Sequence, residues 1–287
     1  MDIKENLNTR LFKDFSANEW DELLGTFDGT INYTAWFINY IEVLNAGFNI
    51  KNLTFGLFKG NEVIAIVPLY VEEVDSKWQM SMGQEPIYAP IINKNAPYDA
   101  FSEYYKYIVD EIERVASQYH CVLARFHYSP LLYTKNSHNY FTEFEYSEDI
   151  LHPDWYIFKS MSSYVINLSN NRDLLIKQIR KGHRANISRT SKLAKLIILD
   201  KESYNQGLFD RYVELYYQIK GLMRTLDVFE LDSIAIRFGL EAIMLCDYKG
   251  KLVGAVALHT YNKKARYNSS VQLYDIDEGI YPNHFLL

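Results

Sequence analysis

Two segments far apart in the chain carry the same short pattern, and this repetition constrains the fold more than any other feature of the sequence. Residues 57–71 read LFKGNEVIAIVPLYV and residues 246–261 read CDYKGKLVGAVALHTY. With a one-residue gap, Lys59-Gly60 aligns with Lys249-Gly250, and each pair is followed by an apolar run typical of a buried strand. A repeat of this length is too long for a solenoid and indicates a duplicated domain.

The flanking patterns also occur in the same order twice. In the first copy we expect helices at residues 15–27, 34–44 and 101–118, and strands at 53–58, 63–71, 77–82 and 120–127. In the second copy we expect helices at 202–219 and 231–240, and strands at 164–168, 242–248, 252–259 and 266–273. The predicted fold class is therefore α/β (α+β), with tandem domains at 1–155 and 156–287. Each domain has a mainly antiparallel twisted sheet flanked by helices, and the irregular stretch 148–163 joins them.

Composition removes several classes of protein. The chain has 287 residues, 48% of them hydrophobic, and no apolar run long enough to span a membrane. Two cysteines in no metal-like or redox-like spacing, and an N-terminus without an apolar signal region, favour a cytoplasmic protein without disulfides. No two glycines are separated by one residue, which excludes the dinucleotide-binding fingerprint, and a catalytic metal is not expected.

Positive charge is concentrated in one segment of this acidic chain. Residues 172–195 contain eight Lys or Arg and one Asp, although the whole chain carries a net charge of −6. On a helix, Lys181 and Arg184 fall on a cationic stripe with Arg180 beside it, while His183 falls on an apolar stripe; Gly182 is the expected break between two short helices. We predict that Arg180, Lys181 and Arg184 bind an anion. The alternative is a solvated polar face.

At this point the chain resembles a known family. The motifs are SYVINLS (163–169), RDLLIKQI (172–179), RKGHRANISRTSKLAK (180–195), the KGKLVGAVAL meander (249–258), YNSS (267–270) and YPNHFLL (281–287). Together they resemble the FemAB-like branch of the GNAT acyltransferases, whose members contain two tandem GNAT-like domains.

The resemblance implies an N-acyltransferase that transfers an aminoacyl or acyl group to an amine of a cell-envelope precursor such as a peptidoglycan precursor. No bound cofactor is implied, and the acyl donor is expected to be aminoacyl-tRNA or acyl-CoA. A backbone N–H on strand 266–273 would polarise the donor carbonyl, so the implied donor-binding residues are Asn268, Ser269 and Ser270, with Asn283 in a helix that starts near Pro282.

The family has no universal catalytic base, and the catalytic candidates by location are Tyr267, Arg224, Asp227 and His259. The CoA signature of the GNAT family, Gln/Arg-x-x-Gly-x-Gly/Ala, is absent from the expected helix; its partial match at residues 218–223 lies in an earlier helix. This departure weakens acetyl-CoA as the donor.

Two alternatives stay open at the level of sequence. One is an acyl-CoA-dependent N-acetyltransferase of an amino sugar or other small amine; the other is a non-catalytic module that binds an anion or tRNA. The repeat also predicts a fifth strand and later elements that the second copy does not contain, because far fewer residues follow Lys249 than follow Lys59 in the first copy. We therefore expect a truncated form, inactive or weakly active alone, with an open edge at 266–273; a short variant closed by a partner or by a homodimer is the alternative.

Overall fold

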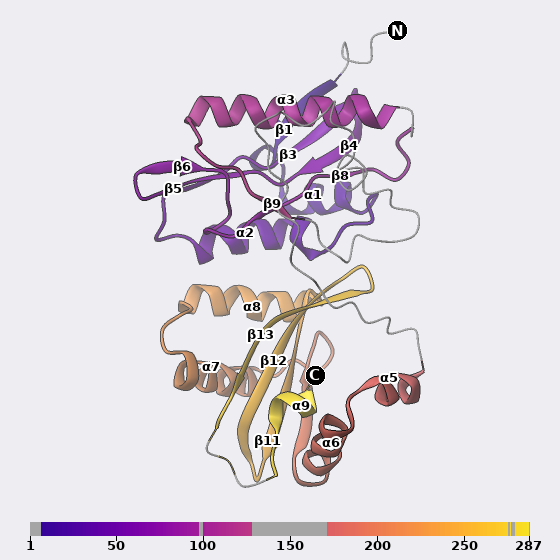
Figure 1. Ribbon diagram of the computed structural model, residues 1–287, viewed down its shortest axis with the longest axis vertical. Coiled ribbons are helices and arrows are strands. Elements are labelled where there is room, and N and C mark those ends of the chain that lie inside the picture. The colour runs from indigo at the N-terminus through magenta and orange to yellow at the C-terminus, as the bar shows by residue number, and fades with distance from the viewer. Residues whose placement is uncertain (1–6, 98–99, 128–170, 275, 277–278, 287) are drawn as a thin grey trace. The chain divides into compact units, whose positions relative to one another are not determined.

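The computed structural model describes residues 7–97, 100–127, 171–274, 276 and 279–286 (Figure 1). Its contacts divide the chain into two compact units, Met1–Val165 and Ile166–Leu287. The predicted linker at 148–163 and the predicted strand at 164–168 lie outside the described residues. Both units combine helices with mainly antiparallel sheets, so the predicted fold class is confirmed.

The first unit is built on a four-stranded antiparallel sheet of order β1-β3-β4-β8. The strands are β1 (Leu7–Leu11), β3 (Phe55–Lys59), β4 (Glu62–Val67) and β8 (Ile91–Ile92). Helices α1 (Ala17–Leu24) and α2 (Ala35–Leu44) lie on one side of this sheet and α3 (Phe101–Tyr119) on the other (Figure 1). A capping box begins α1, within the predicted helix 15–27: the Ser16 hydroxyl accepts from the Glu19 N–H and the Glu19 carboxylate accepts from the Ser16 N–H.

Three strand predictions in the first unit are wrong in extent. The run 63–71 is split at Pro68 into β4 and β5 (Tyr70–Val74), because proline has no N–H to donate to the ladder. The segment 77–82 forms only β6 (Lys77–Gln79), which joins β5 and β2 (Ile50–Asn52) in a separate three-stranded sheet. The segment 120–127 forms only β9 (Phe126–His127), paired in parallel with β7 (Ile87–Tyr88).

The second unit repeats the arrangement with a sheet of order β10-β11-β12-β13, again antiparallel throughout. The strands are β10 (Lys195–Leu199), β11 (Glu241–Tyr248), β12 (Lys251–Tyr261) and β13 (Lys264–Gln272). The sequence patterns did not anticipate β10. Helices α7 (Gln206–Lys220) and α8 (Leu226–Phe238) pack against one face of the sheet, and the short α9 (Pro282–Leu286) packs against the other (Figure 1). Helix α8 begins five residues before the predicted 231–240.

The two hairpins match more closely than their sequences do. In the first, Phe58 pairs with Val63 and Leu57 with Ala65, which leaves Ile64 as an extra residue in a β-bulge. In the second, Asp247 pairs with Leu252 and Cys246 with Gly254, which leaves Val253 as the extra residue. The bulge therefore occurs at the same place in both hairpins, as a duplicated unit predicts.

The hairpin turns also correct the sequence alignment. Lys59 pairs with Glu62 across the first turn, whereas Tyr248 pairs with Lys251 across the second. The structure thus aligns Gly60 with Lys249 without a gap, and the two Lys-Gly pairs are not equivalent.

The basic segment forms two helices, α5 (Arg172–Gln178) and α6 (Lys181–Leu193). The break falls at Ile179 and Arg180, where the backbone is extended, and Gly182 lies in the first turn of α6 instead of at the break. A change of direction therefore occurs just before the predicted anion-binding residues.

Candidate functional site

The second unit contains a group of polar side chains buried between the sheet and its two helices. Glu241 begins β11 and is 1% exposed, and its register partner His259 on β12 is 4% exposed. Residues paired across a sheet place their side chains on the same face, so Glu241 and His259 lie side by side. Asn268 on β13 extends the row, because its side-chain amide donates to Glu241 Oε1 at 3.5 Å.

The two helices complete this group. Arg224, just before α8, donates from Nη1 to Asp232 Oδ2 at 2.9 Å, and its guanidinium lies 5.2 Å from the centre of the Tyr216 ring. Asp232 is fully buried on α8, and Tyr212 of α7 is 1% exposed. We call these six residues the buried polar cluster; its members are Tyr212, Arg224, Asp232, Glu241, His259 and Asn268.

Burial changes the protonation of the cluster. Loss of hydration raises the pKa of Glu241 well above its ordinary range, and the charge of Asp232 raises it further. Burial also raises the pKa of Asp232 to about 6, against the opposing effect of Arg224. The pKa of His259 falls to about 3, because burial and the nearby Arg224 both disfavour the imidazolium. Near neutral pH the histidine is therefore uncharged and the carboxyl groups hold protons more tightly than usual.

A further β-bulge, in β13 of the second unit, lies at this cluster. Ala257 pairs with Ser269 and Leu258 with Tyr267, so Asn268 is the extra residue of β13. A bulge takes one residue out of the regular ladder, and bulges are common next to active sites. The Ser269 hydroxyl lies close to Tyr212 but forms no hydrogen bond of good geometry with it. Of the predicted donor-binding residues, Asn268 thus belongs to the cluster and Ser269 lies next to it.

The other candidates from the sequence lie elsewhere in the second unit. Tyr267 is 49% exposed and donates from its hydroxyl to Ser270 Oγ at 2.8 Å. Asp227 is exposed in the first turn of α8. In α9, which begins at Pro282 as expected, the Asn283 N–H donates to Gln272 Oε1 at 3.4 Å. Of the four catalytic candidates named from the sequence, the structure brings Arg224 and His259 into the cluster and leaves Tyr267 and Asp227 outside it.

The predicted anion-binding residues form a separate surface. Arg180 and Lys181 are exposed, and within the described residues neither forms an ion pair. Arg184 is half-buried. Its Nη1 donates to the Lys177 carbonyl at 2.9 Å, and this hydrogen bond links α6 to α5. We call the surface of Arg180, Lys181 and Arg184 the basic corner.

Helix α6 also holds α9. Asn186 Nδ2 lies 2.9 Å from His284 Nδ1, the rings of His183 and His284 are 4.4 Å apart, and the Thr190 hydroxyl accepts from the Tyr281 N–H at 3.0 Å. We expected His183 to lie on an apolar stripe; its ring instead contacts the ring of His284 in α9.

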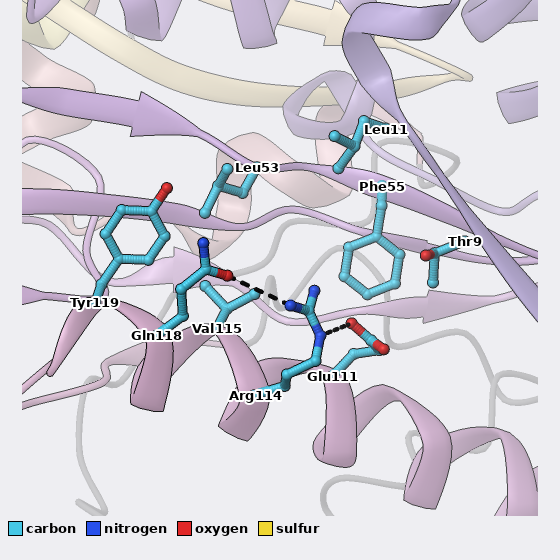
Figure 2. A pocket seen from close by; sticks show the side chains of 9 residues that line it. All are labelled: Thr9, Leu11, Leu53, Phe55, Glu111, Arg114, Val115, Gln118 and Tyr119. Atoms are coloured by element: carbon cyan, nitrogen blue, oxygen red, sulfur yellow. Dashed lines mark hydrogen bonds and ion pairs between the residues drawn. The ribbon is translucent and has the colours of Figure 1, made fainter.

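A cavity of about 200 Å³ lies in the first unit between α3 and the strands, and Figure 2 shows its walls. Leu11, Leu53 and Phe55 form an apolar side. On the α3 side, the guanidinium of Arg114 is held by the Glu111 carboxylate at 2.9 Å and by Gln118 at 3.3 Å (Figure 2). The one cationic group of this wall is thus engaged within its own helix, and the cavity has little of the chemistry found in the cluster.

Sequence reasoning missed Tyr212, Asp232 and Glu241. The signal for Asp232 was present, because it follows Val228 by four residues on the buried face of α8 and precedes Ile236 by four. A charged residue on the apolar stripe of a helix indicates a paired or functional group. Glu241 precedes the apolar run AIMLC of β11, but nothing in the local pattern shows that it faces Asp232.

Comparison with known proteins gives a likeness of fold. No protein-family model and no curated protein matches the sequence. A solved structure entitled "Crystal structure of FemX" superposes with a TM-score of 0.60 and 10% identity, covering 97% of this chain and 83% of that one. A conserved protein of unknown function from Bacteroides thetaiotaomicron VPI-5482 superposes with a TM-score of 0.49 and 11% identity, covering 96% and 88%. The chain thus has a Fem-like fold that extends over both units.

No helix in the described part of the chain combines the length and the apolar character that a membrane span requires.

Proposed function

We propose that this protein is an N-acyltransferase of the FemAB-like type, which transfers an aminoacyl or acyl group to an amine of a cell-envelope precursor. The fold likeness supports this proposal, and so does the strand–helix–helix–strand–strand–strand order of each unit, which fits a GNAT-like domain. The observation that carries the proposal is the bulge at Asn268, because it lies on the strand that the resemblance assigns to the donor and next to the buried polar cluster.

The bulge supplies suitable chemistry for acyl transfer. When an amine attacks an ester or thioester, negative charge develops on the carbonyl oxygen, and a fixed backbone N–H stabilises that charge. A residue outside the regular ladder has a backbone N–H that is not committed to the neighbouring strand. We assign this task to the segment of Asn268 and Ser269.

The basic corner supports an anionic donor. Arginine binds phosphate groups through two parallel hydrogen bonds, and Lys181 adds a point charge. We therefore assign donor phosphates, from aminoacyl-tRNA or another phosphate-bearing carrier, to Arg180 and Lys181. Acetyl-CoA is a weaker candidate because the backbone N–H of Asn283 in α9 is engaged by Gln272.

A donor screen tests the proposal. The thermal unfolding of the intact chain is measured with aminoacyl-tRNA, acetyl-CoA and a nucleotide sugar, and one donor class is expected to raise the Tm. The double variant Arg180→Ala/Lys181→Ala should lose this response. Lys59→Ala/Lys77→Ala, which removes the same charge from exposed positions of the first unit, should keep it.

The salt dependence separates enzyme donors from a binding module. If tRNA is the donor, affinity falls steeply with salt, because each phosphate contact releases a counterion. Transfer of the acyl group to an amine must follow, and tRNA binding without any transfer would favour the non-catalytic module. A response to acetyl-CoA alone would favour the small-amine acetyltransferase.

A further inference from the structure

The buried polar cluster contains three oxygen atoms without a hydrogen-bond partner among the described residues. They are Asp232 Oδ1, Glu241 Oε2 and the hydroxyl oxygen of Tyr212. All three side chains are at least nine-tenths buried. A buried oxygen that lacks a hydrogen-bond partner destabilises the folded state, because it has lost its hydration without a replacement. Three such atoms in one cluster indicate that a group outside the chain supplies the missing hydrogen bonds.

The charges of the cluster give the sign of that group. Asp232 and Glu241 supply two carboxyl groups, Arg224 supplies one guanidinium, and His259 is neutral because burial disfavours its charged form. With both carboxylates ionised the cluster carries a net charge of −1. A buried uncompensated charge is costly, so the cluster must gain either a proton or a cation.

The number of donors needed matches one common cation. A primary ammonium group has three N–H donors and no acceptor, and each of the three oxygens named above, two from carboxyl groups and one from a hydroxyl, can accept a hydrogen bond. A guanidinium would bring five donors in a flat fork, and a quaternary ammonium would bring none.

We propose that the buried polar cluster binds the primary ammonium group of the acceptor and that Glu241 removes its proton before acyl transfer. This assignment rests on the proposed function, because an amine must lose a proton before it can attack an acyl donor. Both protons that the amine loses are accounted for. The ammonium N–H bond breaks, its proton goes to the Glu241 carboxylate, and the freed electron pair attacks the donor carbonyl carbon. The C–O or C–S bond to the donor then breaks and the leaving group takes up the second proton of the amine.

Two exposed apolar side chains adjoin the cluster in the chain. The loop between α7 and α8 ends at buried Arg224 and carries Leu222 and Met223, which are 88% and 71% exposed. These side chains can pack against methylene groups of an alkyl amine, which favours an unbranched arm. The acceptor is therefore expected to present its amine on a slender alkyl chain.

Proton release tests the assignment directly. Burial raises the pKa of Glu241, and a bound ammonium ion would lower it again, so binding is expected to release protons to the solvent. Calorimetric titration of the full chain with n-butylamine, in two buffers of different ionisation enthalpy, should show this proton release. N-butylacetamide, of similar length but uncharged, should not bind.

Variants give the second readout. Glu241→Gln should weaken n-butylamine binding by about tenfold or more and abolish the proton release. Tyr212→Phe removes one acceptor and should weaken binding less. Glu72→Gln makes the same chemical change at another buried glutamate and should leave binding unchanged. Near-identical far-UV spectra and melting curves establish that each variant is folded.

The outcomes separate this inference from the proposed function. If n-butylamine does not bind to the folded wild-type chain, or binds equally to Glu241→Gln, the ammonium site is wrong, even if a donor still raises the Tm through the basic corner. If the amine binds with proton release while no donor binds, the ammonium site stands and the transferase proposal fails.

Discussion

Among the residues that the structure describes, each unit buries one glutamate beside its sheet strands, and the two are stabilised very differently. In the first unit, Glu72 of β5 is 1% exposed and accepts hydrogen bonds from the Ser81 hydroxyl, from the Gln79 amide at 3.1 Å and from the Gln84 N–H at 2.7 Å. In the second unit, Glu241 is equally buried, but its one hydrogen bond from Asn268 is 3.5 Å long and its Oε2 has no partner among the described residues.

This difference is the one expected between a structural glutamate and the functional role that we propose for Glu241. Three donors converge on Glu72 Oε1, so Glu72 holds together the strands and turn that contribute them. Glu241 has a neighbour of like charge and few donors, and such groups cluster at functional sites because stability alone does not favour them. The comparison supports our proposal that the chemistry of the molecule lies in the second unit.

The largest expected effect comes from removing the cation of the cluster. Arg224→Met leaves Asp232 buried without its charge partner, which we expect to lower the free energy of unfolding by about 3–5 kcal/mol. Denaturant unfolding followed by hydrogen exchange of residues 241–261 reports on this unit. The double variant Arg224→Met/Asp232→Leu should recover much of the loss, and no recovery would show that Arg224 stabilises the fold by packing on Tyr216 instead.

Glu72→Ala should have the next largest effect. It leaves the Ser81 hydroxyl, the Gln79 amide and the Gln84 N–H without this acceptor, and we expect a loss of about 2–4 kcal/mol. Tryptophan fluorescence during urea unfolding measures it, since Trp20, Trp36 and Trp78 all belong to the first unit. A loss below that of an exposed Glu→Ala control such as Glu103→Ala would break the proposed contrast between the two glutamates.

The pH dependence of Glu241→Gln should be smaller but more specific. The folded-state pKa of Glu241 is raised, so its contribution to stability is present at low pH and is lost as the pH rises through that pKa. Glutamine cannot ionise. The Tm of the variant minus that of the wild type should therefore increase between about pH 5 and pH 9. A constant difference would mean that Glu241 titrates like an exposed carboxyl group.

His259 makes an opposing contribution to the pH dependence of the Tm. Its pKa is lowered to about 3, so stability is lost as the pH falls from its ordinary value toward that figure. His259→Asn should remove this acid-side loss without changing the slope above neutral pH.

The smallest effect concerns the two hairpin turns. Lys249 has a φ of 53° and Gly250 a φ of 80°, a conformation that Asn-Gly adopts most readily. Lys249→Asn should raise the free energy of unfolding by about 0.5–1 kcal/mol, measured by urea titration. Lys59→Asn is the control, because Lys59 is the last residue of β3 and lies outside the turn. Equal gains at both positions would contradict the ungapped alignment of the hairpins.

The sequence predicted the elements whose signals are local. The helix at 15–27 was predicted because short-range hydrogen bonds, such as those between Ser16 and Glu19, determine its start. The hairpins were predicted because an apolar run follows each Lys-Gly pair. The β10 strand was hidden because its apolar residues follow directly on the basic helix. The bulges were not predictable either, since a bulge depends on the partner strand.

The buried polar cluster required the tertiary structure. Arg224 and Asn268 were named from their positions in the chain, but only the register of β11 with β12 and the packing of α8 place Glu241 beside His259 and Asp232. The structure puts Tyr267 and Asp227 at exposed positions outside the cluster, and their catalytic roles remain predictions.

The hairpin bulge that both units contain has a consequence for the packing of their cores. Leu252 and Ala255 both pack in the core on the side of α7 and α8 although they are three residues apart, because Val253 is the additional residue between them. Deleting Val253, or Ile64 in the first unit, would restore ordinary alternation and leave the neighbouring side chains on their present faces. The bulge is therefore not needed to keep these side chains on their faces, and the property that it gives both hairpins is the added coiling of the strand.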